Sequence, residues 1–130
     1  MLKFGGLNGA IYEAARKDHE AGRHEAAEQG YQRVLAMDPY HYESLHMIGM
    51  LAGQRGRHDL SLEFTDRALA IQPDAPEAHV NRGIALASLD RAADAEASFR
   101  KALALSPGHP KAMASLEILK NLAEGGTGKT

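Results

Sequence analysis

Apolar and polar residues along the chain form a pattern that repeats three times. Each copy ends in a run of small and large apolar residues closed by proline, at Pro39, Pro73 and Pro107. These prolines lie 34 residues apart, since 39 plus 34 is 73 and 73 plus 34 is 107. A strict period of this length is typical of a solenoid, in which each unit buries its apolar face only against its neighbours. The pattern therefore predicts a repeat protein.

Small residues recur at two places in the repeating unit. With the proline at position 32, the units cover residues 8–41, 42–75 and 76–109. The small residues fall at positions 8 and 20 of each unit: Ala15, Gly49 and Gly83 at the first, and Ala27, Ser61 and Ala95 at the second. Small residues at both positions allow two helices to approach closely, which predicts a helix pair in each unit.

Turn residues divide each unit into two helical stretches. Gly22 and Gly56 suit the residue that follows a helix end with positive φ, and Asp90 occupies the same place in the third unit. We expect seven helices, over residues 9–21, 24–37, 42–55, 58–71, 76–88, 92–105 and 110–123. Residues 1–7 are expected to be disordered or frayed, and the glycine-rich residues 124–130 to form a flexible tail.

The amino-acid composition is typical of a helical protein and argues against several classes of function. Apolar residues make up 44% of the chain, and the alanine and leucine that dominate them suit closely packed helices. The chain has no cysteine, which excludes disulfides, thiolate catalysis and thiolate metal sites. A net charge of −2 without a basic block gives no reason to expect a nucleic-acid partner. No apolar stretch suits a signal peptide or a membrane span, which favours a cytoplasmic protein without a membrane partner.

Two features suggest chemistry, but neither has the pattern that the chemistry requires. The segment Ala123–Thr130 matches a relaxed phosphate-loop pattern, but such a loop follows a strand and opens a helix, whereas here a helix precedes it. Among seven histidines, the pairs His19/His24 and His41/His46 are five residues apart, and metal ligands that share a helix face are three or four apart. We therefore expect no metal, no cofactor and no catalytic residue.

The three units resemble tetratricopeptide repeats. Residues that match that family's pattern are Ala15, Ala27, Tyr31 and Pro39 in the first unit, Leu45, Ile48, Gly49, Ala68 and Pro73 in the second, and Gly83, Ala95, Phe99, Ala102 and Pro107 in the third. The chain departs from the pattern at position 11, where the family has an aromatic residue and this chain has Asp18, Ala52 or Leu86. The resemblance covers residues 8–123 and implies a right-handed superhelical solenoid, with a capping helix over 110–123.

In that family the first helices of successive units line a concave groove that binds a peptide or a helix of a partner protein. The resemblance therefore implies a non-catalytic interaction module. The residues singled out for partner binding are Tyr12, Arg16, His46, Met47, Met50, Asn81, Ile84, Lys111 and Ser115. Other residues at groove-facing positions are Glu13, His19, Glu43, Gln54, Glu77, Val80 and Ile118. One subclass clamps a C-terminal carboxylate with five polar residues, the first of them a lysine. In this chain those positions carry His46, Met50, Asn81, Lys111 and Ser115, of which only Asn81 and Lys111 match, too few for that clamp.

Other functions remain open at this stage. The unsatisfied ends of a solenoid could support weak self-association by head-to-tail stacking. The chain could also be the targeting domain of a larger enzyme, such as a bacterial glycosyltransferase or sulfotransferase. RNA binding through the related 35-residue repeats is disfavoured by the 34-residue period and by the acidic net charge.

Overall fold

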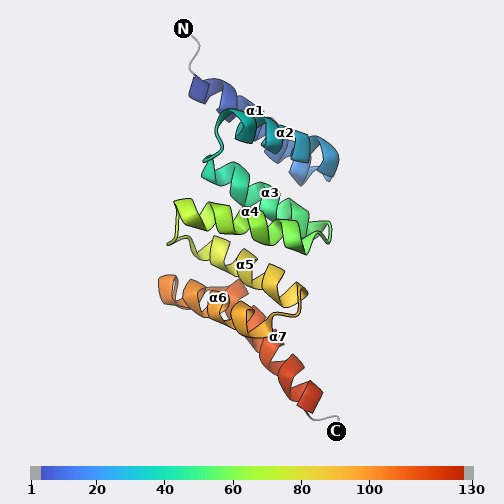
Figure 1. The fold of residues 1–130 in the computed structure, drawn as a ribbon, viewed down its shortest axis with the longest axis vertical. Helices are drawn as coiled ribbons and strands as arrows, with labels where there is room; N and C mark the ends of the chain where they lie inside the picture. The colour runs from blue at the N-terminus through green and yellow to red at the C-terminus, as the bar shows by residue number, and fades with distance from the viewer. Residues whose placement is uncertain (1–3, 128–130) are drawn as a thin grey trace.

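The described residues, 4–127 of the computed structural model, form seven α-helices and no strand. In chain order the helices are α1 (Phe4–Glu20), α2 (His24–Met37), α3 (Tyr42–Gln54), α4 (His58–Ile71), α5 (Pro76–Ser88), α6 (Ala92–Leu105) and α7 (Pro110–Thr127). They stack in sequence order, so that α1 and α7 lie at opposite ends (Figure 1). The predicted all-α solenoid of antiparallel helix pairs is confirmed.

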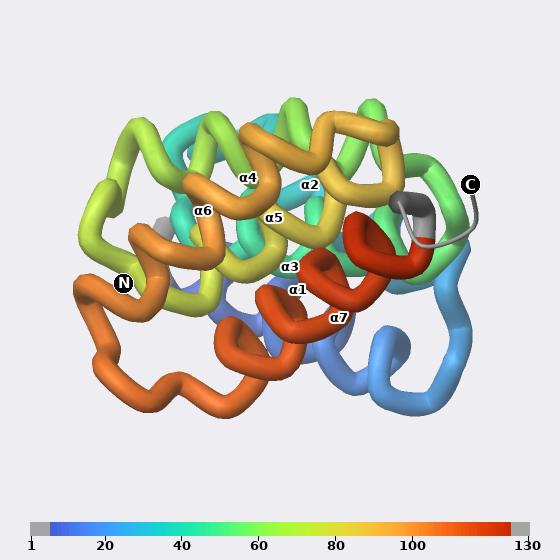
Figure 2. The backbone as a smooth tube through the Cα atoms, turned by 90° about the horizontal axis from the view of Figure 1, so that it is seen from below, coloured from blue at the N-terminus to red at the C-terminus, as the bar shows by residue number. Residues whose placement is uncertain are grey.

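The helices form an inner and an outer layer. Each odd-numbered helix contacts the next odd-numbered one, from α1 to α3, α5 and α7, whereas α2, α4 and α6 make no such contacts with one another. The view along the stack shows α2, α4 and α6 on one side, with α1, α3 and α7 on the other (Figure 2). Helices that are closer together lie on the inside of a curved stack. The odd-numbered helices therefore form the concave layer.

The helix bounds agree with the predicted ranges inside the stack and differ at its two ends. Helix α1 begins at Phe4, so residues 4–7, which were expected to be disordered or frayed, are helical. Helix α7 continues to Thr127, so the expected tail of residues 124–130 is helical as far as Thr127, and its last three residues lie outside the described part. Once a helix has formed, each added residue gains a hydrogen bond without a new nucleation step, which favours extension of α1 and α7 at the two ends of the chain. The glycines of the phosphate-loop-like segment up to Gly126 accordingly belong to a helix.

The predicted turn residues have the predicted backbone conformation. Gly22 and Gly56 have φ of 79° and 78°, and Asp90 has φ of 60° at the same place in the third unit. Aspartate adopts this left-handed conformation more readily than most residues other than glycine, because its short polar side chain can bond locally. The two helices of each unit are therefore joined by the same tight turn.

Small residues at position 8 bring the helices of each unit together, as predicted. A Cβ atom added to Gly83 would lie 2.5 Å from Cε1 of Phe99, and one added to Gly49 would lie 2.9 Å from Oγ1 of Thr65. In the first unit the close approach is between Ala15 and Gly30. Each missing side chain leaves room for a residue of the following helix.

Apolar side chains pack into two buried clusters along the stack. The N-terminal cluster consists of Ala15, Ala27, Tyr31, Ile48 and Leu51. The C-terminal cluster consists of Val80, Leu86, Ala95, Phe99, Ala102 and Ala112. Ala112 belongs to α7, and Leu116 and Leu119 of the same helix pack against this cluster. Helix α7 therefore covers the apolar face of the last helix pair.

Candidate partner-binding groove

The concave layer brings four of the nine predicted binding residues into one cleft. Met50 of α3, Asn81 and Ile84 of α5, and Lys111 of α7 all line it. Its remaining walls are formed by Gly53, Gln54 and Ser61. We call this set of seven residues the α3–α5 cleft. Its lining comes from three successive inner helices and one outer helix, so the cleft exists only in the assembled stack.

Two of the predicted binding residues pack into the protein. Tyr12 and Met47 are partly buried against the N-terminal cluster, and the Tyr12 ring lies 5.4 Å from the His41 ring. Burial raises the pKa of the Tyr12 hydroxyl. Val80, which was placed at a groove-facing position, is fully buried in the C-terminal cluster and does not face the groove. The β-branched side chain at this position instead fills space between α5 and its neighbours.

Arg16 and Ser115 lie on α1 and α7, outside the lining of the α3–α5 cleft. The Arg16 guanidinium forms ion pairs with Glu13 at 3.5 Å and Glu20 at 2.8 Å, all on the surface of α1. The two carboxylates raise the pKa of Arg16. Ser115 is half-buried one turn after Lys111. Both residues belong to the inner layer, and the cleft lies between them along the stack.

His46 lies half-buried on α3, with its ring stacked on the ring of Tyr42 at 5.8 Å. Burial lowers the pKa of His46, and Lys111 also lowers it, while Glu77 acts in the opposite direction. The imidazole is therefore neutral at neutral pH. The position at which the carboxylate-clamp subclass has a cation thus carries an uncharged aromatic ring in this chain.

His19 links α1, α2 and α3 on the concave side. Its Nδ1 lies 3.0 Å from the Tyr31 hydroxyl, and its Nε2 lies 2.7 Å from Oε1 of Gln54. The Gln54 oxygen can only accept, so Nε2–H donates to it, and Nδ1 of that tautomer accepts from the Tyr31 hydroxyl. Because this bond occupies the Gln54 oxygen, the NH2 group of Gln54 is left to donate elsewhere.

Gly53 and Ser61 are the lining residues that sequence reasoning missed. Ser61 was interpreted only as a small residue for helix packing, and Gly53 was not singled out. A Cβ atom on Gly53 would lie 3.2 Å from Oγ of Ser61, so the glycine leaves the floor of the cleft open down to α4. The sequence does offer one signal for Gly53. It is the second-last residue of α3, a place where the turn that follows does not require a glycine.

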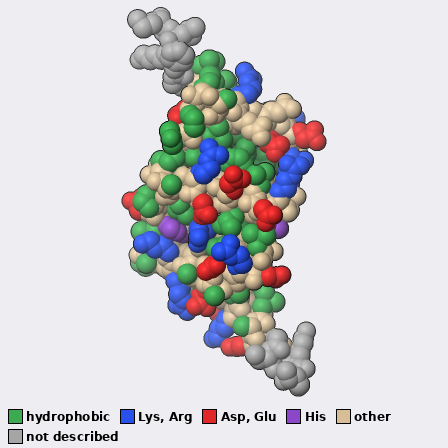
Figure 3. Space-filling view, in the orientation of Figure 1, with side chains coloured by type: hydrophobic (Ala, Val, Ile, Leu, Met, Phe, Trp, Pro, Cys, Tyr) green, Lys and Arg blue, Asp and Glu red, His purple; other side chains and the backbone are tan. Residues whose placement is uncertain are grey.

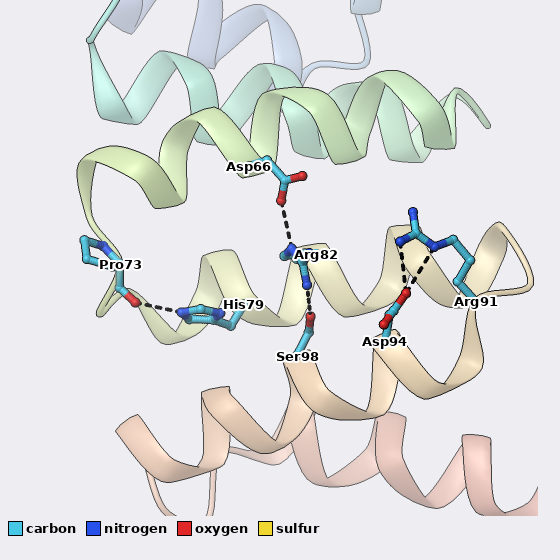
Figure 4. A network of polar contacts seen from close by, with 7 residues as sticks. All are labelled: Asp66, Pro73, His79, Arg82, Arg91, Asp94 and Ser98. Atoms are coloured by element: carbon cyan, nitrogen blue, oxygen red, sulfur yellow. Dashed lines mark hydrogen bonds and ion pairs between the residues drawn. The ribbon is translucent and has the colours of Figure 1, made fainter.

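A polar network holds α5 between its two neighbours (Figure 4). Nε of Arg82 donates to Asp66 of α4 at 2.8 Å, and its NH1 donates to Oγ of Ser98 of α6 at 2.8 Å. Ser98 is buried, so the guanidinium satisfies a hydroxyl that would otherwise lack a partner. Arg82 follows Asn81 directly, and the network therefore helps fix the helix that carries Asn81 and Ile84 into the cleft.

A metal site and a membrane-spanning helix each place requirements on the described residues. No group of three or more His, Asp or Glu side chains among the described residues lies close enough to hold a metal ion. None of the helices over residues 4–127 is long and apolar enough to cross a membrane. Acidic and basic side chains are interspersed on the face seen in Figure 3.

Comparison with known proteins identifies the repeats. A model of the tetratricopeptide repeat family matches residues 12–76 and again 46–110, which together span most of the chain. No curated protein matches the sequence. The two matched ranges overlap and are offset by 34 residues, the same interval that separates the three prolines.

Solved structures share the fold. The first TPR domain of Spaghetti (RPAP3) bound to an HSP90 peptide superposes with a TM-score of 0.86 at 18% identity, covering 89% of this chain and 92% of that one. The Yersinia enterocolitica chaperone SycD in complex with a YopD peptide has a TM-score of 0.84 at 19% identity, covering 94% and 98%. An O-GlcNAc transferase from Thermobaculum terrenum has a TM-score of 0.85 at 28% identity, covering 92% of this chain but 23% of the enzyme. With its matched repeats and this fold, the chain belongs to the tetratricopeptide repeat family.

Proposed function

We propose that this chain is a non-catalytic, cytoplasmic interaction module that binds a peptide or helix of a partner protein in its concave groove. The observation that carries the proposal is the α3–α5 cleft, in which Met50, Asn81, Ile84 and Lys111 meet from three inner helices. Two proteins of the same fold are described with a peptide bound. Their likeness supports a peptide-sized occupant for the groove of this chain.

The chemistry of the cleft suits a peptide with both apolar and polar side chains. Met50 and Ile84 give apolar walls, and methionine adapts to irregular surfaces because its side chain is flexible and polarisable. Asn81 and Lys111 supply hydrogen-bond donors, which orient a partner. His46, one turn before Met50 on α3, lies outside this lining, with its ring stacked on Tyr42.

A related candidate is a targeting domain within a larger enzyme. The likeness to the Thermobaculum terrenum O-GlcNAc transferase, of which the matched part is 23%, favours this second reading. In that case the same groove binds the proteins on which the enzyme acts, and the chain itself catalyses nothing. The two readings differ in the partner and agree on the groove.

An affinity capture with matched variants tests the proposal. The wild-type chain is compared with a Met50→Ala, Asn81→Ala, Lys111→Ala variant and with a control variant, Gln32→Ala, Arg33→Ala, Lys101→Ala, whose three residues are exposed on the outer helices. All three baits are first checked for equal helicity by circular dichroism. We expect partners that the wild type and the control retain and the groove variant loses. Equal capture by all three baits would overturn the groove assignment.

Self-association is the alternative that the same purified chains can test. The solenoid leaves an open groove between α6 and α7, lined in part by the exposed Met113 and the half-buried Leu116. Light scattering over a concentration series measures the molar mass directly. A constant monomer mass excludes self-association, and a mass that rises with concentration supports it.

A further inference from the structure

The α3–α5 cleft is an opening on the concave side of the stack whose lining includes one residue of an outer helix. Its volume is about 210 Å³, several times the roughly 30 Å³ that one water occupies in the liquid. Ser61 belongs to the outer helix α4 and is only 4% exposed, so the cleft reaches the second layer of the solenoid. Gly53 keeps this path open, because any side chain there would extend toward Ser61.

Asn81 is the residue in the cleft whose side chain has an unsatisfied hydrogen-bond donor. It is 7% exposed, and its Nδ2 is a buried donor with no acceptor among the described residues. A buried donor without a partner costs free energy, so such groups in proteins usually have a function or a missing partner. Met50 lines the same cleft, and its flexible side chain can turn aside to admit an acceptor.

The other polar groups of the cleft also favour an anionic acceptor. Lys111 is exposed and forms no ion pair within the described residues. The amide of Gln54 has its oxygen engaged by His19, which leaves its NH2 group as a further donor. None of the seven lining residues is acidic. The cleft therefore offers several donors and one positive charge, with no carboxylate of its own to satisfy them.

We propose that the α3–α5 cleft is an anchor subsite for a glutamate side chain in an internal segment of the partner. The inference rests on the proposed function and specifies the side chain that the groove selects. The two methylene groups of glutamate pass between Met50 and Ile84. Its carboxylate accepts from Asn81 and Gln54 and pairs with Lys111, in charge-assisted hydrogen bonds.

The apolar walls of the cleft favour a side chain over the free carboxylate of a chain terminus. A terminal carboxylate is attached directly to the backbone and has no apolar stem to place between Met50 and Ile84. Aspartate has one methylene fewer than glutamate and reaches less far. The five-residue clamp for C-terminal carboxylates is also incomplete, because His46 is neutral and Met50 is apolar. An internal glutamate is therefore the better fit.

The test uses two displayed peptide libraries and the full chain as bait. In the first library a constant segment follows the random residues, so that no random residue has a free carboxylate, and in the second the random residues end the peptide. We expect the first library to yield sequences that share one internal glutamate. Synthetic peptides with both ends blocked, carrying that glutamate or a glutamine in its place, are then compared by fluorescence anisotropy. The glutamine peptide should bind about tenfold more weakly or worse.

Variants of the cleft locate the effect. Asn81→Ala and Lys111→Ala should each reduce the preference for glutamate over glutamine, while Lys120→Ala, a matched lysine on α7 outside the cleft, should keep it. Gly53→Leu fills the cleft beside Ser61 while Asn81, Gln54 and Lys111 stay in place, and it should lose most of the affinity, with Gly53→Ala as a smaller step. Because a variant can misfold, the side-chain amide signal of Asn81 is also followed by NMR in the wild type, where at equal saturation it should shift further with the glutamate peptide than with the glutamine peptide.

Each outcome of this test bears on one of the two proposals. If neither library yields a binder, the groove function and the anchor are both overturned. Groove-dependent binders without a glutamate preference, or a preference that survives Asn81→Ala, overturn the anchor and leave the groove function standing. Binders from the second library alone would assign the cleft to a terminal carboxylate and overturn the side-chain assignment.

Discussion

At the residue scale, Gly83 sets how closely α5 and α6 approach, because its missing Cβ leaves room for the ring of Phe99. In Gly83→Ala the new Cβ would lie 2.5 Å to 2.7 Å from three carbons of that ring, which forces the helices apart. Overpacking of this kind costs about 1–3 kcal/mol, more than the roughly 1 kcal/mol that alanine gains over glycine in a helix. We expect a lower free energy of unfolding, measured by urea denaturation.

The matched control is Gly9→Ala in α1. Gly9 also lies inside a helix, but a Cβ added there meets nothing within 4 Å. This variant should gain about 0.5–1 kcal/mol of stability, because alanine is the better helix former and no contact opposes it. Two glycine-to-alanine changes are thus expected to have opposite signs. A Gly83→Ala chain as stable as the wild type would mean that the Phe99 ring does not constrain this helix pair.

His46 gives the fold a pH dependence whose sign follows from its burial. Its pKa in the folded chain is lowered from the ordinary 6.5, chiefly by burial, with Lys111 lowering it further and Glu77 opposing. The unfolded chain therefore binds more protons than the folded one just below pH 6.5, and stability falls as the pH decreases through this region. We expect His46→Gln to lose less stability than the wild type between neutral and mildly acidic pH, measured by thermal unfolding at each pH. If the melting temperatures of the two chains fell equally with decreasing pH, the assigned role of His46 would be wrong.

At the scale of single elements, the start of helix α7 depends on His109. Its Nδ1 accepts from the backbone N–H of Ala112 at 3.3 Å, and its Nε2–H donates to Glu77 of α5. One ring therefore caps α7 and ties it to the inner layer. His109→Ala should cost about 0.5–2 kcal/mol, the usual range for the loss of a helix cap. Thermal unfolding measures the change.

A second variant separates the two roles of His109. His109→Ser keeps an N-cap acceptor for α7 and removes only the bond to Glu77, so it should recover most of the stability that alanine loses. If serine and alanine destabilise the chain equally, the contact with Glu77 is the main contribution. Two variants at one position thus distinguish the cap of an element from the contact between elements.

Repetition explains which elements could be predicted from the sequence and which could not. Turn residues such as Gly22 and Asp90 recur at one place in each unit, so helix bounds inside the stack were predicted to within a residue. The ends have no second copy for comparison, and both α1 and α7 were predicted too short. The face of each inner helix followed from its position in the unit, but the outer-helix residue in the lining of the cleft did not. That lining depends on Gly53 lying against Ser61 of the next helix, a contact that no periodic pattern specifies.

At the scale of the whole molecule, each helix is stabilised only by contacts with its neighbours in the stack. Each helix contacts only the next one or two in the sequence, so no long-range contact joins the two ends. In such a chain the stability is close to a sum of unit and interface contributions. Loss of one end therefore weakens the adjacent helices first. The clusters at the two ends, around Tyr31 and around Phe99, should respond separately.

Helix α7 provides the sharpest test of this view, because it covers the last helix pair. Ala112 is fully buried, and Leu116 and Leu119 pack against the C-terminal cluster. A chain that ends at Gly108 no longer buries these apolar side chains of α7. Its free energy of unfolding should fall by about 3 kcal/mol, a large share of an ordinary domain's stability. Hydrogen exchange should then show faster exchange in α5 and α6 than in α1 to α3, and light scattering should show association through the exposed cluster. A chain that ends at Gly125 keeps these contacts and serves as the control. Equal melting temperatures and a constant monomer mass for the two truncated chains would show that α7 does not act as a cap.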